Sequence, residues 1–252
     1  MPSVIKRFAN RLKQEGFVTT VKKLPHLVSV KIRFWFRDQK PGFYTRFGTS
    51  YRKWFKTQQD HELNFWNDPL KTYPLDGFPN LREKLFHLNK DMFNNLILNF
   101  PEGKIADIGC GPELGFLPYA NAKFKIGIDP LANEYQKKYK FENDILMISA
   151  LAETIPLCSG SLDAIYCINA LDHMYRPYKA LDEMYRVLKP GGYFALAVDI
   201  GGTKKHPVKI MEADMDRWFA NHSFKIIEKS CMSKTGDRWS GVPLYVFQGY
   251  KQ

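Results

Sequence analysis

Two glycines and one acidic residue near the middle of the chain have the types and spacing of a nucleoside site. Gly109 and Gly111 follow an apolar run, and a backbone without Cβ atoms can turn sharply there and approach a ligand closely. Asp129 ends the next apolar run, where a carboxylate can accept hydrogen bonds from both hydroxyls of a ribose. Ligands of open parallel sheets bind at such strand ends. The pattern therefore predicts a bound nucleoside.

The same loop distinguishes between two kinds of nucleoside cofactor, a dinucleotide and S-adenosylmethionine. A dinucleotide fingerprint needs G-x-G-x-x-G, but position 114 is Leu and the third glycine is Gly115. Asp107, two residues before Gly109, adds a negative charge that a pyrophosphate disfavours. The cationic methionine end of S-adenosylmethionine tolerates that charge. A nicotinamide-dependent oxidoreductase is therefore the less favoured alternative.

Three polar residues follow the fourth and fifth apolar runs and are candidates for proton transfer. Asp172 and His173 come after the fourth run, and Asp199 ends the fifth. Neutral imidazole suits a general base because its ordinary pKa is close to neutrality. Asp199 is expected to orient His173, to bind a sugar hydroxyl, or to act as the base itself. The alternative is that His173 packs under the cofactor or caps the next helix.

The elements that position these residues alternate between short apolar runs and helical segments. The predicted strands are Ile105–Ile108, Phe124–Ile128, Ile145–Ile148, Leu162–Ile168 and Tyr193–Val198. Apolar residues repeat at helical spacing from Ala180 onward, and this predicted helix stops at Lys189-Pro190-Gly191. A second helix is predicted from Met211 to Phe219. Two last runs, Phe224–Ile227 and Leu244–Phe247, are expected to pair antiparallel at the sheet edge. This order predicts a doubly wound, mostly parallel α/β fold.

Composition excludes several other classes of protein. The chain of 252 residues is 44% hydrophobic and 25% charged, which is typical of a globular protein. No apolar stretch approaches the roughly 18 to 20 residues of a membrane span, and no secretory signal pattern is recognisable. The four cysteines form no C-x-x-C pair, and free thiols in a reducing cytoplasm are expected.

The positive charge is concentrated at the N-terminus. Residues 1–60 hold fourteen Lys and Arg against three Asp and Glu, which equals the whole net charge of +11. Val4, Ile5, Phe8 and Leu12 recur at helical spacing among basic residues. Such a helix can contact an anionic membrane or another anionic partner, or it can simply cap the main domain. Residues 1–89 are predicted to form a mostly helical cap and residues 90–252 the main domain; no nucleic-acid motif is present.

Five segments of the main domain resemble a known family. They are Ala106–Gly111, Gly127–Asp129, Ala152–Pro156, Ser161–Ile165 and Ala180–Gly192. In order and spacing these segments resemble the class I S-adenosylmethionine-dependent methyltransferases, especially the small-molecule branch with a compact domain. The resemblance covers residues 90–200 approximately and implies S-adenosylmethionine as the cofactor.

The resemblance implies a role for each matching residue. The implied cofactor residues are Asp107, Gly109, Cys110 and Gly111 for the methionine moiety, Asp129 for the ribose, Leu151 and Ala152 for adenine, and Asn169 and Ala170 beneath the sulfonium. Leu151 stands where the family often has Asp or Asn, so packing and the backbone of Ala152 are expected to recognise adenine. His173 matches the position of a general base in similar enzymes. Metal-dependent relatives carry an extra ligand where this chain has Ile200, so no metal is expected between Asp172 and Asp199.

The acceptor is the least constrained part of the prediction. The segment Gln58–Asn67 carries His61, Glu62, Phe65 and Trp66 and is expected either to form a lid over the acceptor or to pack against the domain. A similar stretch precedes the domain in enzymes that resemble those decorating bacterial surface carbohydrates. This stretch predicts a cytoplasmic O-methyltransferase that acts on a sugar or glycan precursor. The basic N-terminus further favours an anionic acceptor. The alternative is a cofactor-binding module without transferase activity.

Overall fold

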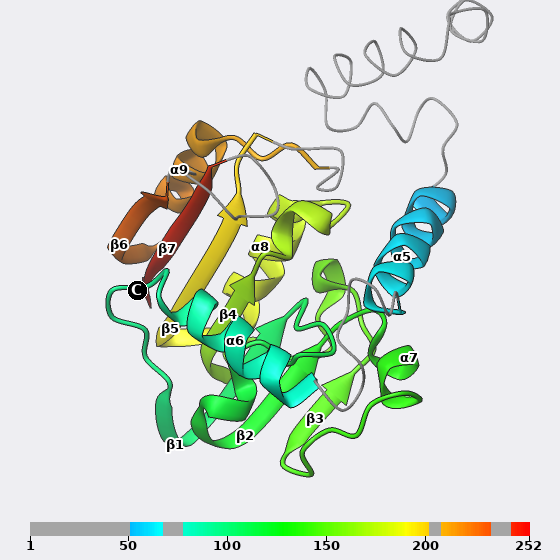
Figure 1. Ribbon diagram of the computed structural model, residues 1–252. Helices are drawn as coiled ribbons and strands as arrows, with labels where there is room; N and C mark the ends of the chain where they lie inside the picture. The colour runs from blue at the N-terminus through cyan, green and yellow to red at the C-terminus, as the bar shows by residue number, and fades with distance from the viewer. Residues whose placement is uncertain (1–50, 68–77, 202–207, 233–242) are drawn as a thin grey trace, which may run out of the picture. The chain divides into compact units, whose positions relative to one another are not determined.

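The computed structural model describes residues 51–67, 78–201, 208–232 and 243–252 (Figure 1). The predicted amphipathic helix around Val4 to Leu12 lies outside these residues. The chain divides into two compact units, Met1–Thr57 and Gln58–Gln252. This division falls ahead of the boundary at residue 90 that the composition predicts.

A seven-stranded sheet forms the centre of the second unit. Its strands are β1 (Asn99–Ile108), β2 (Asn121–Ile128), β3 (Ile145–Ile148), β4 (Leu162–Ile168), β5 (Leu188–Asp199), β6 (Phe224–Met232) and β7 (Leu244–Lys251). The strand order is β3-β2-β1-β4-β5-β7-β6. Strands β1 to β5 are parallel, and β7 runs antiparallel to both β5 and β6. The predicted doubly wound, mostly parallel fold and its antiparallel edge pair are therefore confirmed.

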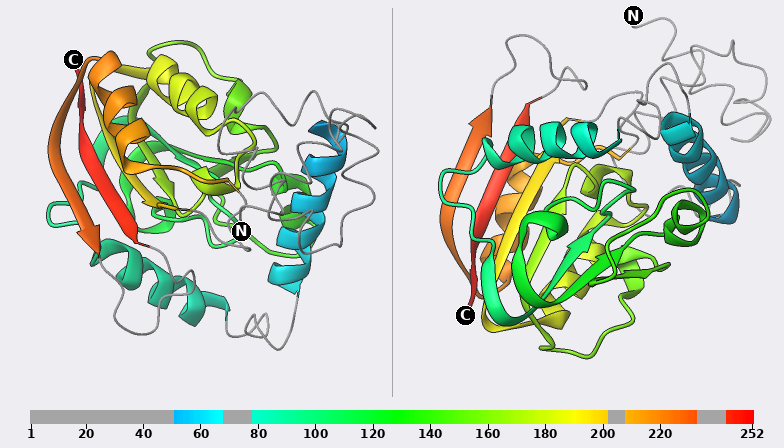
Figure 2. Two further views of the ribbon diagram at one scale, coloured as in Figure 1. Left: turned by 90° about the horizontal axis from the view of Figure 1, so that it is seen from above. Right: turned by 60° about the horizontal axis from the view of Figure 1, so that its bottom comes forward.

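The helices bury both faces of the sheet because the central strands are apolar on both sides. On one face, α8 (Pro177–Val187) and α9 (Glu212–Asn221) pack on Ala106 and Ile108 and their neighbours. On the other face, α6 (Phe78–Lys90) and the chain after it pack over Ile105 and its neighbours (Figure 2). Alternate residues of β1 thus enter two separate cores, which holds the carboxyl end of the strand rigidly.

Two boundaries differ from those predicted. Helix α8 ends at Val187 rather than at Lys189-Pro190-Gly191, because Leu188 is already extended, with a ψ of 134°. Strand β5 consequently begins at Leu188, which pairs with Leu162 before the register shifts. Pro190 disfavours helical backbone at Lys189 only, and the pairing of Leu188 with Leu162 places the end of the helix one residue earlier still.

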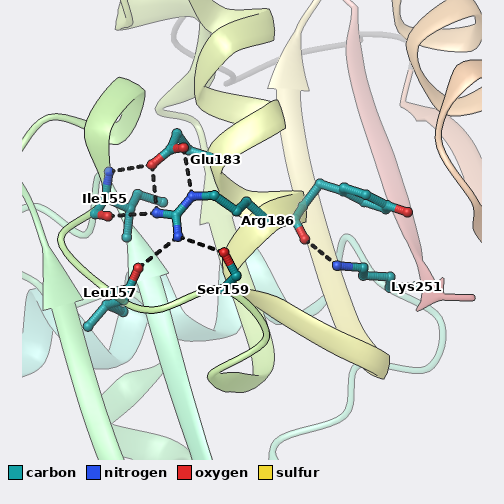
Figure 3. Close-up of polar contacts among 7 residues, drawn as sticks. Ile155, Leu157, Ser159, Glu183, Arg186 and Lys251 are labelled. Atoms are coloured by element: carbon teal, nitrogen blue, oxygen red, sulfur yellow. Dashed lines mark hydrogen bonds and ion pairs between the residues drawn. The ribbon is translucent and has the colours of Figure 1, made fainter.

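An arginine on α8 fixes the loop that follows η3 (Ala152–Thr154). Arg186 donates to the carbonyls of Ile155 and Leu157, at 2.9 and 2.8 Å (Figure 3). It also pairs with Glu183, whose carboxylate accepts the Ile155 amide at 2.9 Å. The guanidinium therefore ties the backbone after β3 to the helix after β4. This loop follows the segment predicted to contact adenine.

Replacing Arg186 with Met leaves two carbonyls without their donor. We expect Arg186→Met to lower the free energy of unfolding by about 1 to 3 kcal/mol, the cost of unsatisfied partly buried polar groups. Urea unfolding measures this. Arg217→Met is the matched control: the exposed Arg217 side chain pairs with Asp214 at the same spacing on α9, and its loss is expected to cost less than about 0.5 kcal/mol. Equal costs for the two variants would contradict the role of Arg186.

Candidate functional site

The glycine turn after β1 is built to lie close to two neighbouring strands. Gly109 has a φ of +72° and Gly111 a φ of +57°, values that favour glycine. The Gly109 amide donates to the carbonyl of Ile128 on β2 at 2.7 Å. A Cβ on Gly109 would overlap the Cβ of Ala170, which follows β4. The predicted turn therefore meets the ends of β2 and β4 where the carboxyl ends of the parallel strands lie together. We call this end of the sheet the cofactor edge.

Asp129 lies at the end of β2 and faces this turn. Its Oδ2 accepts the Gly111 amide at 3.1 Å, and its Oδ1 accepts the Leu131 amide at 2.8 Å. The side chain is 8% exposed. Burial raises the pKa of Asp129 to about 6, although the two amides act in the opposite direction. Each carboxylate oxygen can accept a further hydrogen bond, so a diol donor has acceptors at this position.

Asp107, near the end of β1, is a buried residue that accepts a hydrogen bond from the loop after the glycine turn. It is 1% exposed, and its Oδ2 accepts the Phe116 amide at 3.2 Å. A Cβ on Gly115 would overlap this carboxylate, so a glycine is required where the chain passes over it. Burial raises the pKa of Asp107 to about 7; the Phe116 amide lowers it and the Asp129 charge raises it. The predicted negative charge beside the loop is thus buried within it.

Glu113 belongs to the same loop and was not predicted as a site residue. Its carboxylate lies so close to Gly111 that a Cβ at that position would overlap it. The Oε2 atom is buried with no hydrogen-bond partner among the residues that the structure describes. Burial raises the pKa of Glu113 to about 8, and the charges of Asp129, Asp107 and Glu62 raise it further. The only signal in the sequence is an acidic residue two positions after a loop glycine, which by itself does not distinguish a buried side chain from a solvated one.

The other predicted cofactor residues lie around this edge. Asn169 directly follows β4 with a φ of 53°, a left-handed conformation that asparagine adopts more readily than most non-glycine residues, and its backbone amide donates to the carbonyl of Ala197 at 2.9 Å. Leu151 is half-buried before η3, and Ala152 is buried within it. The side chain of Cys110 points into the core, with its Sγ 4.0 Å from the Sδ of Met147.

The predicted proton-transfer residues also come together. Asp172 and His173 lie in η4 (Leu171–His173), and Asp199 is buried at the end of β5. The Nδ1 atom of His173 is 2.9 Å from the Oε1 atom of Glu62 on α5 (Tyr51–Asn67). Burial by itself lowers the pKa of His173, but the Glu62 hydrogen bond and the charges of Asp172, Glu62 and Asp199 together raise it above its ordinary value.

Two further features of the described part of the chain concern metals and membranes. Across residues 51–67, 78–201, 208–232 and 243–252, no three His, Cys, Asp or Glu side chains are grouped to hold a metal ion. None of the helices in these ranges is long and apolar enough to cross a membrane. The four cysteines, all within these ranges, are free.

Comparison with known proteins identifies the domain. Residues 106–196 match the family described as the methyltransferase domain. The chain contains a class I S-adenosylmethionine-dependent methyltransferase domain. The methyltransferase domain has the fold of a structure titled a putative S-adenosylmethionine-dependent methyltransferase from Listeria monocytogenes, with a TM-score of 0.52 at 15% identity over 68% of this chain and 99% of that one.

Two curated relatives match the methyltransferase domain more closely in sequence. The probable methyltransferase ltbC of Aspergillus luteorubrus is 30% identical over 142 residues, which cover 50% of this chain and 48% of that protein. The 24-methylenesterol C-methyltransferase 2 of Arabidopsis thaliana is 32% identical over 118 residues, which cover 42% of this chain and 32% of that protein. The matches thus span less than half the length of either relative.

The residues at this edge fit the cofactor of the family. S-adenosylmethionine is a nucleoside with a sulfonium and an ammonium group, so it needs acceptors for a ribose and negative charge near its amino-acid part. Asp129 supplies acceptors beside a glycine turn, and Asp107 and Glu113 supply buried carboxyl groups. Burial disfavours the ionised form of these carboxyl groups, as their raised pKa values show, and a bound cation would stabilise that form.

The raised pKa values have a consequence for stability. The folded methyltransferase domain holds protons on Asp107, Asp129 and Glu113 at pH values where the unfolded chain has lost them. Its free energy of unfolding should therefore fall as the pH rises from about 4 to about 8. We expect Glu113→Gln to raise the free energy of unfolding by about 1 to 3 kcal/mol at about pH 8, and by less at about pH 5.5, in urea titrations without cofactor.

Glu102→Gln is the matched control for this measurement. Glu102 is exposed and pairs with Lys123, so its replacement is expected to leave the pH dependence of stability unchanged. A Glu113→Gln variant that loses as much stability on raising the pH as the wild type would contradict a buried carboxyl group with a raised pKa at this position.

Proposed function

We propose that this protein transfers a methyl group from S-adenosylmethionine to an oxygen of a small-molecule acceptor. The observation that carries the proposal is the Asp129 carboxylate, which faces the glycine turn through its bond to the Gly111 amide. Bound there, the cofactor supplies an activated methyl group, so the protein needs only to align the acceptor and exclude water. No covalent intermediate on the protein is required.

The cofactor residues have separate tasks in this proposal. Asp129 accepts hydrogen bonds from the ribose hydroxyls, and Asp107 and Glu113 place negative charge near the methionine moiety. The backbone of Gly109, Cys110 and Gly111 lets that moiety approach closely. Leu151 and Ala152 pack on adenine, held in place through the Arg186 contacts to the following loop. Asn169 and Ala170, at the end of β4, lie beneath the sulfonium.

The assignment of an oxygen acceptor rests on His173. A hydroxyl loses its proton as the new bond forms, and a neutral imidazole near the carboxyl ends of β4 and β5 is suited to accept it. Asp172 and Asp199 lie close enough for their charges to act on the imidazole and to stabilise it once protonated. A carbon acceptor is the second candidate, because a relative that is 32% identical is a C-methyltransferase.

A sugar or glycan precursor is the acceptor class we propose. The fourteen basic residues among the first sixty favour an anionic molecule, for which a nucleotide sugar or a lipid-linked precursor is suited. The same residues favour contact with an anionic membrane surface from the cytoplasmic side.

Cofactor binding gives the first test. We expect Asp129→Asn to weaken the binding of S-adenosylmethionine at least about tenfold, since an amide nitrogen cannot accept the hydrogen bond that a carboxylate oxygen accepts. Isothermal titration calorimetry measures the dissociation constants. Asp144→Asn is the matched control, because Asp144 is exposed and pairs with Lys125 before β3. Equal affinity in wild type and Asp129→Asn would contradict the proposed ribose contact.

Transfer itself is tested with a labelled methyl group. Incubation of the protein with methyl-labelled S-adenosylmethionine and fractionated nucleotide sugars or glycan precursors should label a product whose new bond is a methyl ether. A product methylated on carbon would favour the second candidate. Tight cofactor binding with no label in any acceptor would favour a binding module without transferase activity.

A further inference from the structure

A carboxylate from the helix before the methyltransferase domain contacts the proposed base. The Oε1 atom of Glu62 lies 2.9 Å from the Nδ1 atom of His173, and the two side chains are only 25% and 23% exposed. Glu62 belongs to α5 and precedes the matched residues 106–196 by a wide margin in the sequence. A hydrogen bond of this length to a partly buried carboxylate is stronger than one in open solvent.

A second contact holds this part of α5 in place. The Tyr139 hydroxyl, after α7 (Ala132–Gln136), donates to the carbonyl of Trp66 at 3.2 Å. Trp66 lies four residues after Glu62, on the same side of the helix. The charge of Glu62 also acts on Asp129 and Glu113, which belong to the cofactor edge. Glu62 thus contacts η4 and lies near enough to the cofactor loop for its charge to act there.

We propose that Glu62 is a positioning residue for His173 and that the acceptor site is incomplete without α5. The inference rests on the proposed function and extends it to a residue outside the family match. Glu62 accepts the Nδ1 proton, which fixes the ring and leaves Nε2 as the basic atom. In this arrangement Nε2 is the atom that accepts the proton of the acceptor hydroxyl.

The proton and electrons balance in this arrangement. The acceptor oxygen forms a bond to the methyl carbon, and the carbon–sulfur bond breaks with its electron pair on sulfur. The hydroxyl proton moves to Nε2 of His173, and the resulting imidazolium is stabilised by three carboxylates. These are Glu62 from α5, Asp172 from η4 and Asp199 from β5, the acidic groups within the described part of the chain whose charges raise the pKa of His173.

The first experiment follows the imidazole directly and needs no acceptor. The six histidines of the full chain are titrated by NMR, and His173→Gln identifies the signal of His173. We expect Glu62→Gln to lower the pKa of His173 by about one unit, because it removes an adjacent negative charge. Asp60→Asn, which removes the same charge from an exposed position of the same helix, should leave this pKa unchanged.

Several outcomes of this titration would overturn the inference. An unchanged His173 titration in Glu62→Gln would show that the two side chains do not interact in solution. An equal shift in Asp60→Asn would show a general effect of helix charge rather than a specific contact. Glu62→Asp restores the charge, so a shift that persists in this variant would place the effect in the fold rather than in the carboxylate.

The second experiment measures the role in transfer. We expect Glu62→Gln to lower kcat about ten- to a hundredfold and to move the acid limb of the kcat/KM profile to lower pH, with little change in the affinity for S-adenosylmethionine. A profile that does not move would refute the positioning role. If no acceptor is methylated, the proposed function fails while the titration still decides whether Glu62 holds His173, so the two failures are distinguishable.

Discussion

The hydrogen bond between the Gly111 amide and the Asp129 carboxylate is the contact on which the site depends. It joins the turn after β1 to the end of β2, and Asp129 also accepts the amide of Leu131. Both strands are buried at this end, so the sheet fixes the positions of donor and acceptor. Because the turn also packs on Ala170, the ends of β1, β2 and β4 meet here, held by one sheet with a core on each face.

The electrostatics of this edge follow from burial more than from the number of charges. Asp107, Glu113 and Asp129 lose solvation in the fold, and their raised pKa values record that cost. Such a cluster lowers the free energy of unfolding when no cation is bound, and a bound cation raises it again. The basic surplus of the first sixty residues is separate in sequence from this acidic edge. In the proposed function the two charge distributions serve different ligands, a cationic cofactor and an anionic acceptor.

The strands and the glycine turn could be predicted because each depends on local pattern. β3 and β4 begin and end where the apolar runs do, and Asp129 follows from its place after β2. The predicted end of α8 was wrong by two residues, since Leu188 pairs with Leu162 of β4, a long-range contact that no local pattern shows. The contact between Glu62 and His173 was not predictable, because residues so far apart in sequence meet only through the tertiary fold. Glu113 was missed because nothing local shows that its side chain turns inward.

The central claim is that this edge binds a cationic nucleoside and stabilises its charge with buried carboxylates. Calorimetric titration of the wild-type protein with S-adenosylmethionine at about pH 7, in buffers of different ionisation enthalpy, tests it most directly. The account predicts saturable binding with a net release of protons, and weaker binding of the uncharged-sulfur product S-adenosylhomocysteine. Absence of binding, or binding without proton release and with no preference between the two, would contradict it.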